Sequence, residues 1–354
     1  MFQCKIIKMK ALINSAFFIF LFSGCYSLFG PKTDVTAFFE LEITSADTAK
    51  AKEILLNRLS DEFYKNNILL ENNGSQWILT ITNYDSIETP LSALRKLITS
   101  QGKLEFWETF DNKDIYSSLT EVDSYIARDS VMNNISEEEK SDTSQLAKYK
   151  REHPLIGTIL FPYADESRQA LIAGPVAGIA LIKDTAKAME YLSNYKIKNL
   201  LPRNLRFAWT MNPPDRYKRP SYNKEEVSVR GLIALKTSNE GNEARLSGNI
   251  ISDAGIRYDK RSGGFPYVET TMNDEGAKIW ETMTEENTGK AIAITVDGEV
   301  YSYPTVMSKI VGGKSTITGN FTPEEARTLV SILKSSGYSY SVKIAGEHII
   351  REQK

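Results

Sequence analysis

Alternating apolar and polar residues predict strands and helices in the N-terminal third of the chain. Apolar residues alternate with mainly polar neighbours from Val35 to Ile43, which is the period of a half-buried strand. Apolar residues at four-residue spacing from Ala51 to Phe63 then predict a helix with one buried face. A second alternating run, Trp77 to Ile81, follows an Asn73-Gly74 turn, and Leu104 to Phe110 is predicted to form a third strand.

The C-terminal part of the chain carries the same kind of pattern. Thr322 is the predicted N-cap of a helix, Pro323 suits its first position, and Glu325 can complete a capping box. We expect this helix to end at Gly337 and residues Tyr338 to Ile344 to form a strand. The two chain ends are therefore expected to pair in one small α+β layer, with a long insertion between them.

The insertion changes composition twice. Residues Asp111 to Glu152 are polar, and we interpret them as a solvated segment with some helix. The stretch from Leu171 to Ile182 is the most apolar internal one, but it is shorter than the ~20 residues that a membrane span requires. We interpret it as a buried strand or loop. Three prolines at 213, 214 and 220 then mark a linker, after which a further unit begins near Glu225.

The N-terminus has the layout of a secretory signal. Three lysines precede an apolar run from Ala11 to Phe22, and the small residues Ser23 and Gly24 lead into Cys25. This ending resembles the bacterial lipobox, in which the cysteine is acylated and becomes the new N-terminus. We therefore expect residues 1–24 to be a signal peptide, Cys25 to carry lipid, and residues 25–33 to act as a tether. An ordinary signal peptide with an incidental cysteine is the alternative.

Composition and charge narrow the function classes. With 354 residues, 41% of them hydrophobic, the chain can bury a substantial core, and we expect it to form two packed units. The net charge is -2 and the basic residues are spread along the chain, which argues against a nucleic-acid partner. One of the two cysteines leaves with the signal and the other would be acylated, so we expect no disulfide.

None of the motifs that suggest catalysis or a cofactor is complete. Gly313-Lys314-Ser315 lacks the earlier glycine and the strand-to-helix context of a phosphate-binding loop. The only histidines, His153 and His348, have no flanking ligand pattern for zinc or for a triad. Asp297 suits a hairpin turn better than a catalytic pair. We therefore expect a protein without enzymatic activity, metal or cofactor.

The passage from Val268 to Phe321 carries the most specific signal. Asn273 is predicted to start a helix, Ile292 to Val296 to form a strand, and Asp297-Gly298 to make a tight turn into the next strand. The passage resembles the head subdomain of SecD. The matching positions are Asn273, Glu275, Gly276, Ala277, Trp280, Thr284, Asn287, Gly289, Asp297, Gly298, Ser302, Pro304, Gly312, Gly313, Ile317, Thr318 and Gly319.

Further blocks resemble the first periplasmic domain of the SecDF proteins of the Bacteroidetes. They include Leu104 to Phe110, Lys183 to Lys187, Leu200 to Arg203 and Leu246 to Ala254, and with the C-terminal helix they span Lys103 to Ile344. This resemblance implies an α+β fold, in which an inserted head subdomain interrupts a ferredoxin-like base. The expected parts are the base at 34–110 and 320–354, a lineage insertion and linker at 111–224, and the SecD-like head at 225–319.

The resemblance implies a function in protein export. We expect a stand-alone lipoprotein on the periplasmic side of the envelope, more readily on the cytoplasmic than on the outer membrane, that binds unfolded or translocating polypeptides. Sec translocase subunits are candidate partners. The chain ends at Lys354, where the family's remaining membrane helices would begin, so we expect no proton-driven activity. The alternative is a repurposed envelope binding lipoprotein that keeps the fold and has no export role.

Three head residues are candidates for polypeptide contact. Tyr301, Tyr303 and Met307 offer flat rings and a thioether, which can pack against varied apolar side chains. Trp280, in contrast, is expected in the core.

Overall fold

The protein is described here from a computed structural model of the whole chain. The structure describes residues 33–45, 47–60, 67–74, 76–84, 90–129, 132, 141–163, 170–214, 229–238, 243–247, 249–258, 264–319, 321–335 and 340–353. The predicted signal peptide at 1–24, Cys25 and the predicted tether up to residue 32 lie outside these residues, as do Phe63, Pro220, Glu225 and Gly337. Within this part of the chain, no helix is both long and apolar enough to cross a membrane.

The two ends of the chain form one four-stranded antiparallel sheet, here called the base. Its strands are β1 (Thr33–Ser45), β2 (Ile68–Asn72), β3 (Trp77–Ile81) and β14 (Tyr340–Gln353), in the order β14-β1-β3-β2. This order with antiparallel neighbours is that of a ferredoxin-like sheet. The predicted pairing of the two chain ends is present, because β14 pairs with β1 along its whole length.

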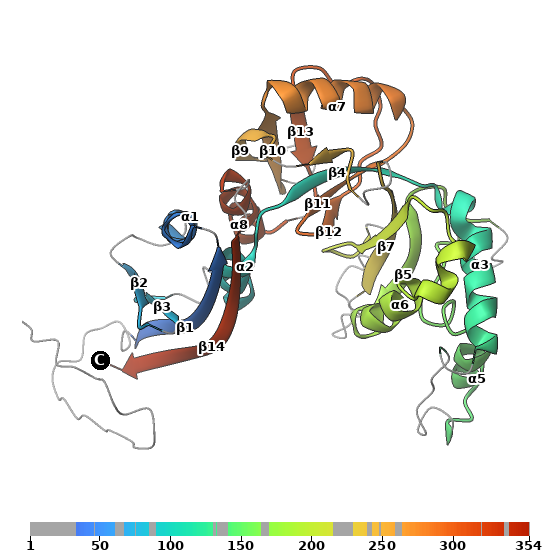
Figure 1. Cartoon of the computed structure of the whole chain (residues 1–354), viewed down its shortest axis with the longest axis horizontal. Coiled ribbons are helices and arrows are strands. Elements are labelled where there is room, and N and C mark those ends of the chain that lie inside the picture. Colours follow the sequence, from blue (N-terminus) through green and yellow to red (C-terminus); the bar gives the residue numbers. More distant parts are fainter. Residues whose placement is uncertain are drawn as a thin grey trace, which may run out of the picture.

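Three helices pack against one another beside the base sheet. They are α1 (Thr48–Ser60), α2 (Leu91–Thr99) and α8 (Pro323–Lys334). Helices α1 and α2 contact strands of the sheet, and α8 contacts those two helices. The predicted capping box of α8 is formed, with the Thr322 hydroxyl accepting from the Glu325 amide and the Glu325 carboxylate accepting from the Thr322 amide. The base therefore draws its helices, like its strands, from both ends of the chain (Figure 1).

A larger antiparallel sheet connects the base to the rest of the molecule. Its main path is β12 (Glu299–Ser302), β11 (Ile292–Val296), β4 (Leu104–Thr109), β7 (Val229–Lys236) and β5 (Val176–Leu181), with β6 (Leu205–Trp209) beside β7 and β8 (Leu246–Ser247) beside β4. The strand predicted at Leu104 to Phe110 exists, but it lies in the middle of this sheet and not in the base. Burial explains this position, because nearly every β4 side chain on both faces is buried.

A third sheet carries the helix of the predicted head. Strands β9 (Ile251–Tyr258), β10 (Pro266–Met272) and β13 (Lys314–Ile317) form it in the order β13-β10-β9, and α7 (Asp274–Glu286) follows β10. This unit lies above β4 and β11, while the base and the insertion lie at opposite ends of the long axis (Figure 1).

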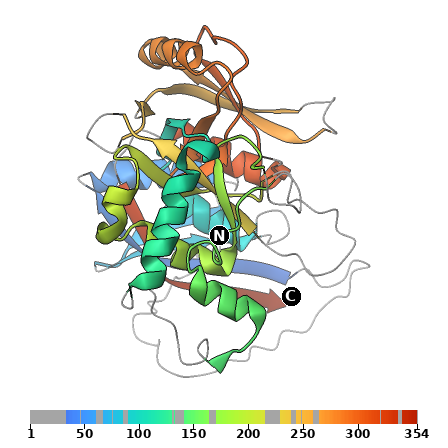
Figure 2. The same cartoon turned by 90° about the vertical axis from the view of Figure 1, so that its right-hand side faces the viewer.

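The insertion differs from the expectation of a solvated segment. Helix α3 (Asn112–Arg128) buries Ile115, Leu119, Val122 and Ile126 along one stripe. This stripe packs in one buried cluster with side chains of α6 (Thr185–Leu192), η3 (Tyr195–Leu200), β5 and β6 (Figure 2). The short helices α5 (Gln145–Glu152) and η2 (Ile182–Asp184) also belong to the insertion, but none of their described residues is part of this cluster. Within the apolar stretch from Leu171 to Ile182, predicted to be a buried strand or loop, residues Val176–Leu181 form the largely buried strand β5.

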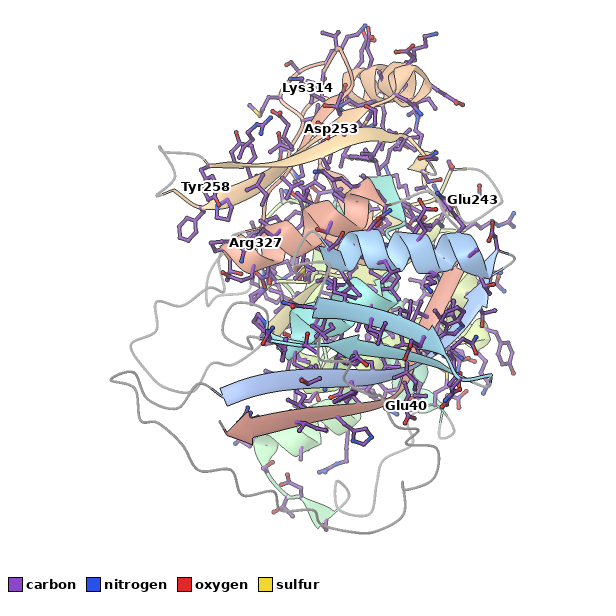
Figure 3. The ribbon with its side chains drawn as sticks, turned by 90° about the vertical axis from the view of Figure 1, so that its left-hand side faces the viewer. Glu40, Glu243, Asp253, Tyr258, Lys314 and Arg327 are labelled. Atoms are coloured by element: carbon purple, nitrogen blue, oxygen red, sulfur yellow. The ribbon has the colours of Figure 1, made fainter. Side chains whose placement is uncertain are left out.

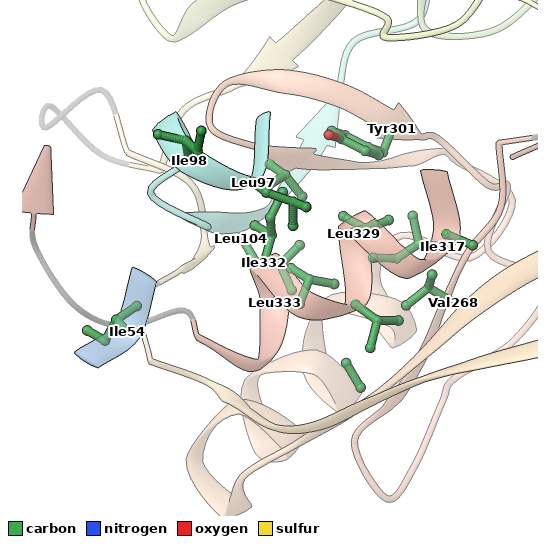
Figure 4. Packing of buried hydrophobic residues seen from close by; sticks show 14 of the residues in the cluster. Ile54, Leu97, Ile98, Leu104, Val268, Tyr301, Ile317, Leu329, Ile332 and Leu333 are labelled. Atoms are coloured by element: carbon green, nitrogen blue, oxygen red, sulfur yellow. The ribbon is translucent and has the colours of Figure 1, made fainter. Parts of the chain in front are cut away.

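One continuous core joins the base to the head. Side chains from α2 and α8, such as Leu97 and Ile332, belong to the same buried cluster as Val268 and Ile317 of the third sheet (Figure 4). The insertion has its own cluster around α3. The molecule is thus α+β, as predicted, and its head rests on helices of the base.

Candidate functional site

The loop between β12 and β13, residues 303–313 and here called the head loop, holds two of the predicted contact residues. Backbone bonds fix its course, because the Val306 amide donates to the Lys290 carbonyl at 2.9 Å. The Ile310 amide donates to the Thr284 hydroxyl at 2.9 Å. The loop is therefore tied at two points to the segment formed by α7 and its C-terminal turn.

Helix α7 itself is set in place by local sequence. The Asn273 side chain accepts a hydrogen bond from the Gly276 amide at 2.9 Å and caps the helix, as predicted. Trp280 is buried, as expected, with its ring 4.9 Å from that of Phe106 on β4. Its indole nitrogen donates to the Lys314 carbonyl of β13 at 3.1 Å. The helix that holds the head loop is thus anchored to two sheets.

A surface ion cluster adds a further tie. The Lys309 ammonium of the head loop lies 2.8 Å from Glu281 Oε1 and 3.2 Å from Glu285 Oε2, both on α7. Hydrogen bonds to these two carboxylates raise the pKa of Lys309. Because the groups are exposed, the cluster orients the loop more than it stabilises the fold.

The tied loop presents apolar side chains to solvent. Val306 is buried and Ile310 is half-buried, whereas Met307 is 83% exposed and Val311 is 66% exposed. Met307 therefore lies where a polypeptide can reach it. Val311 was not among the residues predicted from the sequence. An ordered loop with exposed apolar side chains can bind an apolar segment with little loss of its own conformational entropy.

Two glycines shape the C-terminal end of the head loop. Gly312 and Gly313 have φ angles of +80° and +65°, which side chains other than glycine rarely adopt. A Cβ on Gly313 would lie 2.7 Å from Cβ of Ala277 on α7. Gly313 is thus required both by its φ angle and by close packing against α7, whereas Gly312 is required by its φ angle alone. Lys314 begins strand β13, so no phosphate-binding turn forms here.

A small cleft lies beside the head loop. It has a volume of about 140 Å³ and is lined by Thr210, Asn212, Pro213, Val300, Tyr301, Ser302, Tyr303, Pro304, Thr318 and Gly319. Tyr303 is half-buried at this cleft, while Met307 does not line it. The structure thus places Tyr303 and Met307 on one loop, but in different surroundings.

Tyr301 was expected to contact polypeptides at the surface, but the structure buries it. It is 7% exposed and lies among the buried hydrophobic residues (Figure 4). Its ring lies 6.2 Å from the Phe321 ring and 4.7 Å from the Lys96 ammonium. Burial raises the pKa of its phenol, and the Glu299 and Asp297 carboxylates add to this effect. Tyr301 therefore joins head to base and does not offer its ring to an incoming chain.

A charged cluster surrounds Tyr301 at the junction of base and head. Glu299 lies 3.3 Å from the Lys96 ammonium of α2 and 2.8 Å from Nη1 of Arg230 on β7. Partial burial raises the pKa of Glu299, but the two positive charges outweigh it, so the pKa lies below its ordinary value. Glu299 therefore stays ionised and ties three elements together.

The predicted turn at Asp297-Gly298 also contacts the base. Asp297 and Gly298 have φ angles of +51° and +82°, as this tight turn requires. The Asp297 carboxylate accepts hydrogen bonds from the Ser100 hydroxyl and from the amides of Gln101, Gly102 and Lys103. It thus anchors the segment where the chain leaves the base.

The two histidines lie on other elements and in unrelated surroundings. His153 Nδ1 lies 2.9 Å from the Asp123 carboxylate in the insertion, and His348 lies on β14 opposite Phe38. Within the described part of the chain, no three His, Cys, Asp or Glu side chains gather closely enough to hold a metal ion.

Comparisons with known proteins match most of this region to one family. Residues 233–337 match the family described as SecDF, P1 head subdomain. The chain is 30% identical over 314 residues to the protein translocase subunit SecD of Rhodothermus marinus, covering 85% of this chain and 46% of that protein. It is 39% identical over 105 residues to the protein translocase subunit SecD of Syntrophobacter fumaroxidans, covering 30% of this chain and 20% of that protein. The chain thus spans less than half the length of either relative.

One solved structure is similar over most of the chain. It is described as that of a membrane component, SecDF, that enhances protein export. It shares 19% identity and has a TM-score of 0.41, covering 87% of this chain and 98% of that one.

Proposed function

We propose that this chain, whose residues 233–337 are similar to the SecDF P1 head subdomain, assists protein export by binding unfolded or translocating polypeptides through the head loop. The observation that carries the proposal is this match, because it contains the whole of the head loop and the helix that holds it. The binding is non-enzymatic and requires no nucleotide, metal or proton gradient of the chain's own.

The surface of the head loop supports polypeptide binding. Met307 and Val311 are exposed on a loop held by backbone bonds, so their apolar contacts need little reordering of the protein. A thioether adapts to side chains of different shape, which suits a site that meets many sequences. A site of this kind cannot optimise its contacts to one partner, so we expect dissociation constants on the order of micromolar.

A lipid on Cys25 would hold the base close to the membrane. Cys25 precedes Thr33, the first residue of β1, by eight positions. A fully extended segment of that length spans at most about 29 Å. The start of β1, and the end of β14 paired with it, would then lie close to the periplasmic surface, near polypeptides that emerge from a translocase.

Site-specific photocrosslinking in living cells tests the proposal. A photoreactive residue at Met307 should crosslink newly made secretory chains and Sec translocase subunits. The control is Leu69, which is 51% exposed on β2 of the base and should give few such products. Equal labelling at both positions, or no secretory chains at Met307, would favour a repurposed envelope lipoprotein without an export role.

A further inference from the structure

Strand β14 is an open edge of the base sheet. Among the described residues it pairs only with β1, and Figure 3 shows it as the outermost strand. Its last residues, from Ile350 onward, lie opposite β1 residues that β3 does not reach, because β3 pairs with β1 only from Ala37 to Leu41. Such an edge offers unpaired backbone groups to another strand.

Hydrogen bonding shows which residues face outward. The Tyr84 amide donates to the Val35 carbonyl at 2.9 Å, so Val35 turns its backbone groups toward β3. Neighbouring residues of a strand alternate in this direction, so Thr36 turns toward β14. Its partner Ile350 therefore directs its backbone groups toward β1, and Ile349 directs its backbone groups toward the open edge. By the same alternation, Glu347 and Arg351 also direct their backbone groups outward.

The residues whose backbone groups point to the open edge, Glu347, Ile349 and Arg351, form a self-complementary sequence. Glu347 and Arg351 stand two positions on either side of Ile349, which is 39% exposed. When two copies pair antiparallel around Ile349, each Glu347 stands opposite the other copy's Arg351. Pairing centred on Glu347 or on Arg351 instead places like charges opposite each other, and centring on His348 or Ile350 leaves the charges unmatched.

The Glu347 carboxylate is held in place by a helix of the base. The Arg95 guanidinium of α2 donates two hydrogen bonds to its carboxylate and so lowers the pKa of Glu347. The carboxylate is therefore fixed and ionised at the edge. Charges on an edge strand usually discourage pairing with other chains. Here the order of the charges on Glu347 and Arg351 matches a second copy of the same strand. A strand with the reverse order of charges would place like charges opposite each other.

We propose that two copies of this protein pair edge to edge through β14, antiparallel and centred on Ile349, to make one continuous sheet from two bases. The occupant of the edge is a second copy and not a translocating polypeptide. Anchoring both copies in one membrane would raise their effective concentration and favour this pairing.

Disulfide trapping in cell membranes tests the register. In the proposed pair the two Ile349 Cα atoms lie about 5.5 Å apart, within the range that a disulfide spans. The full chain with Ile349→Cys should form a disulfide-linked dimer on mild oxidation, whereas the parent chain and Leu69→Cys, on the opposite edge, should not. Equal dimer formation by the two variants, or crosslinks from the Ile349→Cys chain to other proteins only, would overturn the proposal.

Charge reversal provides a second test that does not depend on cysteine geometry. In the Ile349→Cys background, Arg351→Glu places two like-charged pairs across the edge and should reduce the dimer about tenfold. Glu347→Arg should reduce the dimer by a similar factor, because it places two positively charged pairs across the edge. Co-expression of the two reversed chains restores both Glu–Arg pairs, so the mixed dimer should form preferentially. If neither reversal changes the dimer yield, the proposed register is wrong.

Discussion

The buried arginine of α1 allows a quantitative test of the interrupted base. Arg58 is 1% exposed, and its guanidinium donates to the Leu97 carbonyl at 3.0 Å and to the Ser100 carbonyl at the end of α2. It also donates to the Ser335 hydroxyl at the end of α8, at 2.9 Å. One side chain thus joins three helices from both ends of the chain.

Replacing Arg58 by Met keeps most of the volume and removes these donors. A hydrogen bond to a charged group contributes about 1.5–3 kcal/mol, and losses within one network do not add fully. We therefore expect Arg58→Met to destabilise the base by about 3–5 kcal/mol. That is a large part of the ~5–15 kcal/mol that stabilises a typical domain.

Hydrogen exchange read by mass spectrometry measures this loss locally. Protection of peptides from β1 and β14 should fall together, by about two to four orders of magnitude, because each 1.4 kcal/mol is a factor of ten. Peptides from α3 report on the separate core of the insertion and should change little. Arg257→Met is the control, because Arg257 is exposed and its partner Glu269 lies 3.4 Å away at the surface. Loss of protection in β1 without loss in β14 would refute the single interrupted base.

Three further predictions concern other parts of the molecule. Cys25→Ser should abolish fatty-acid labelling and release the protein from the membrane; continued labelling would contradict the anchor. Glu299→Gln should destabilise the protein at pH 7, and since the pKa of Glu299 is lowered in the fold, the difference from wild type should shrink as pH falls below about 4. A difference that stays constant down to pH 3 in urea unfolding would contradict this. Gly313→Ala should lower stability by about 2–3 kcal/mol, and Gly312→Ala by only about 1, because Gly312 has no atom within 4 Å of an added Cβ; equal melting shifts would refute the packing argument.

Local signals in the sequence predicted local structure well. The capping box at Thr322 and the turn at Asp297-Gly298 depend on residues within four positions of each other, and both are present. The pairing of the two chain ends was also predicted, because each end carried strand and helix patterns that needed a partner. The alternation from Trp77 to Ile81 likewise corresponds to β3.

Partners far along the chain could not be predicted in the same way. Alternation tells which face of a strand is buried but not which strand lies beside it, so the sequence pattern alone wrongly assigns residues Leu104 to Phe110 to the base. Tyr301 is buried because Phe321 and Lys96 approach it, and neither is near it in sequence. In α3, a polar composition hid the apolar stripe from Ile115 to Ile126, although its helical spacing was readable.

Titration of unfolded secretory segments against the purified protein tests the central claim most directly. The wild-type protein should show saturable, micromolar binding without nucleotide, metal or a proton gradient. Met307→Asp should weaken it at least about tenfold without lowering the melting temperature, because Met307 is 83% exposed and a charge there opposes apolar contact. Leu69→Asp, the matched change on the base, should bind as wild type does. No saturable binding at millimolar concentrations, or equal loss in both variants, would contradict a polypeptide-binding head loop.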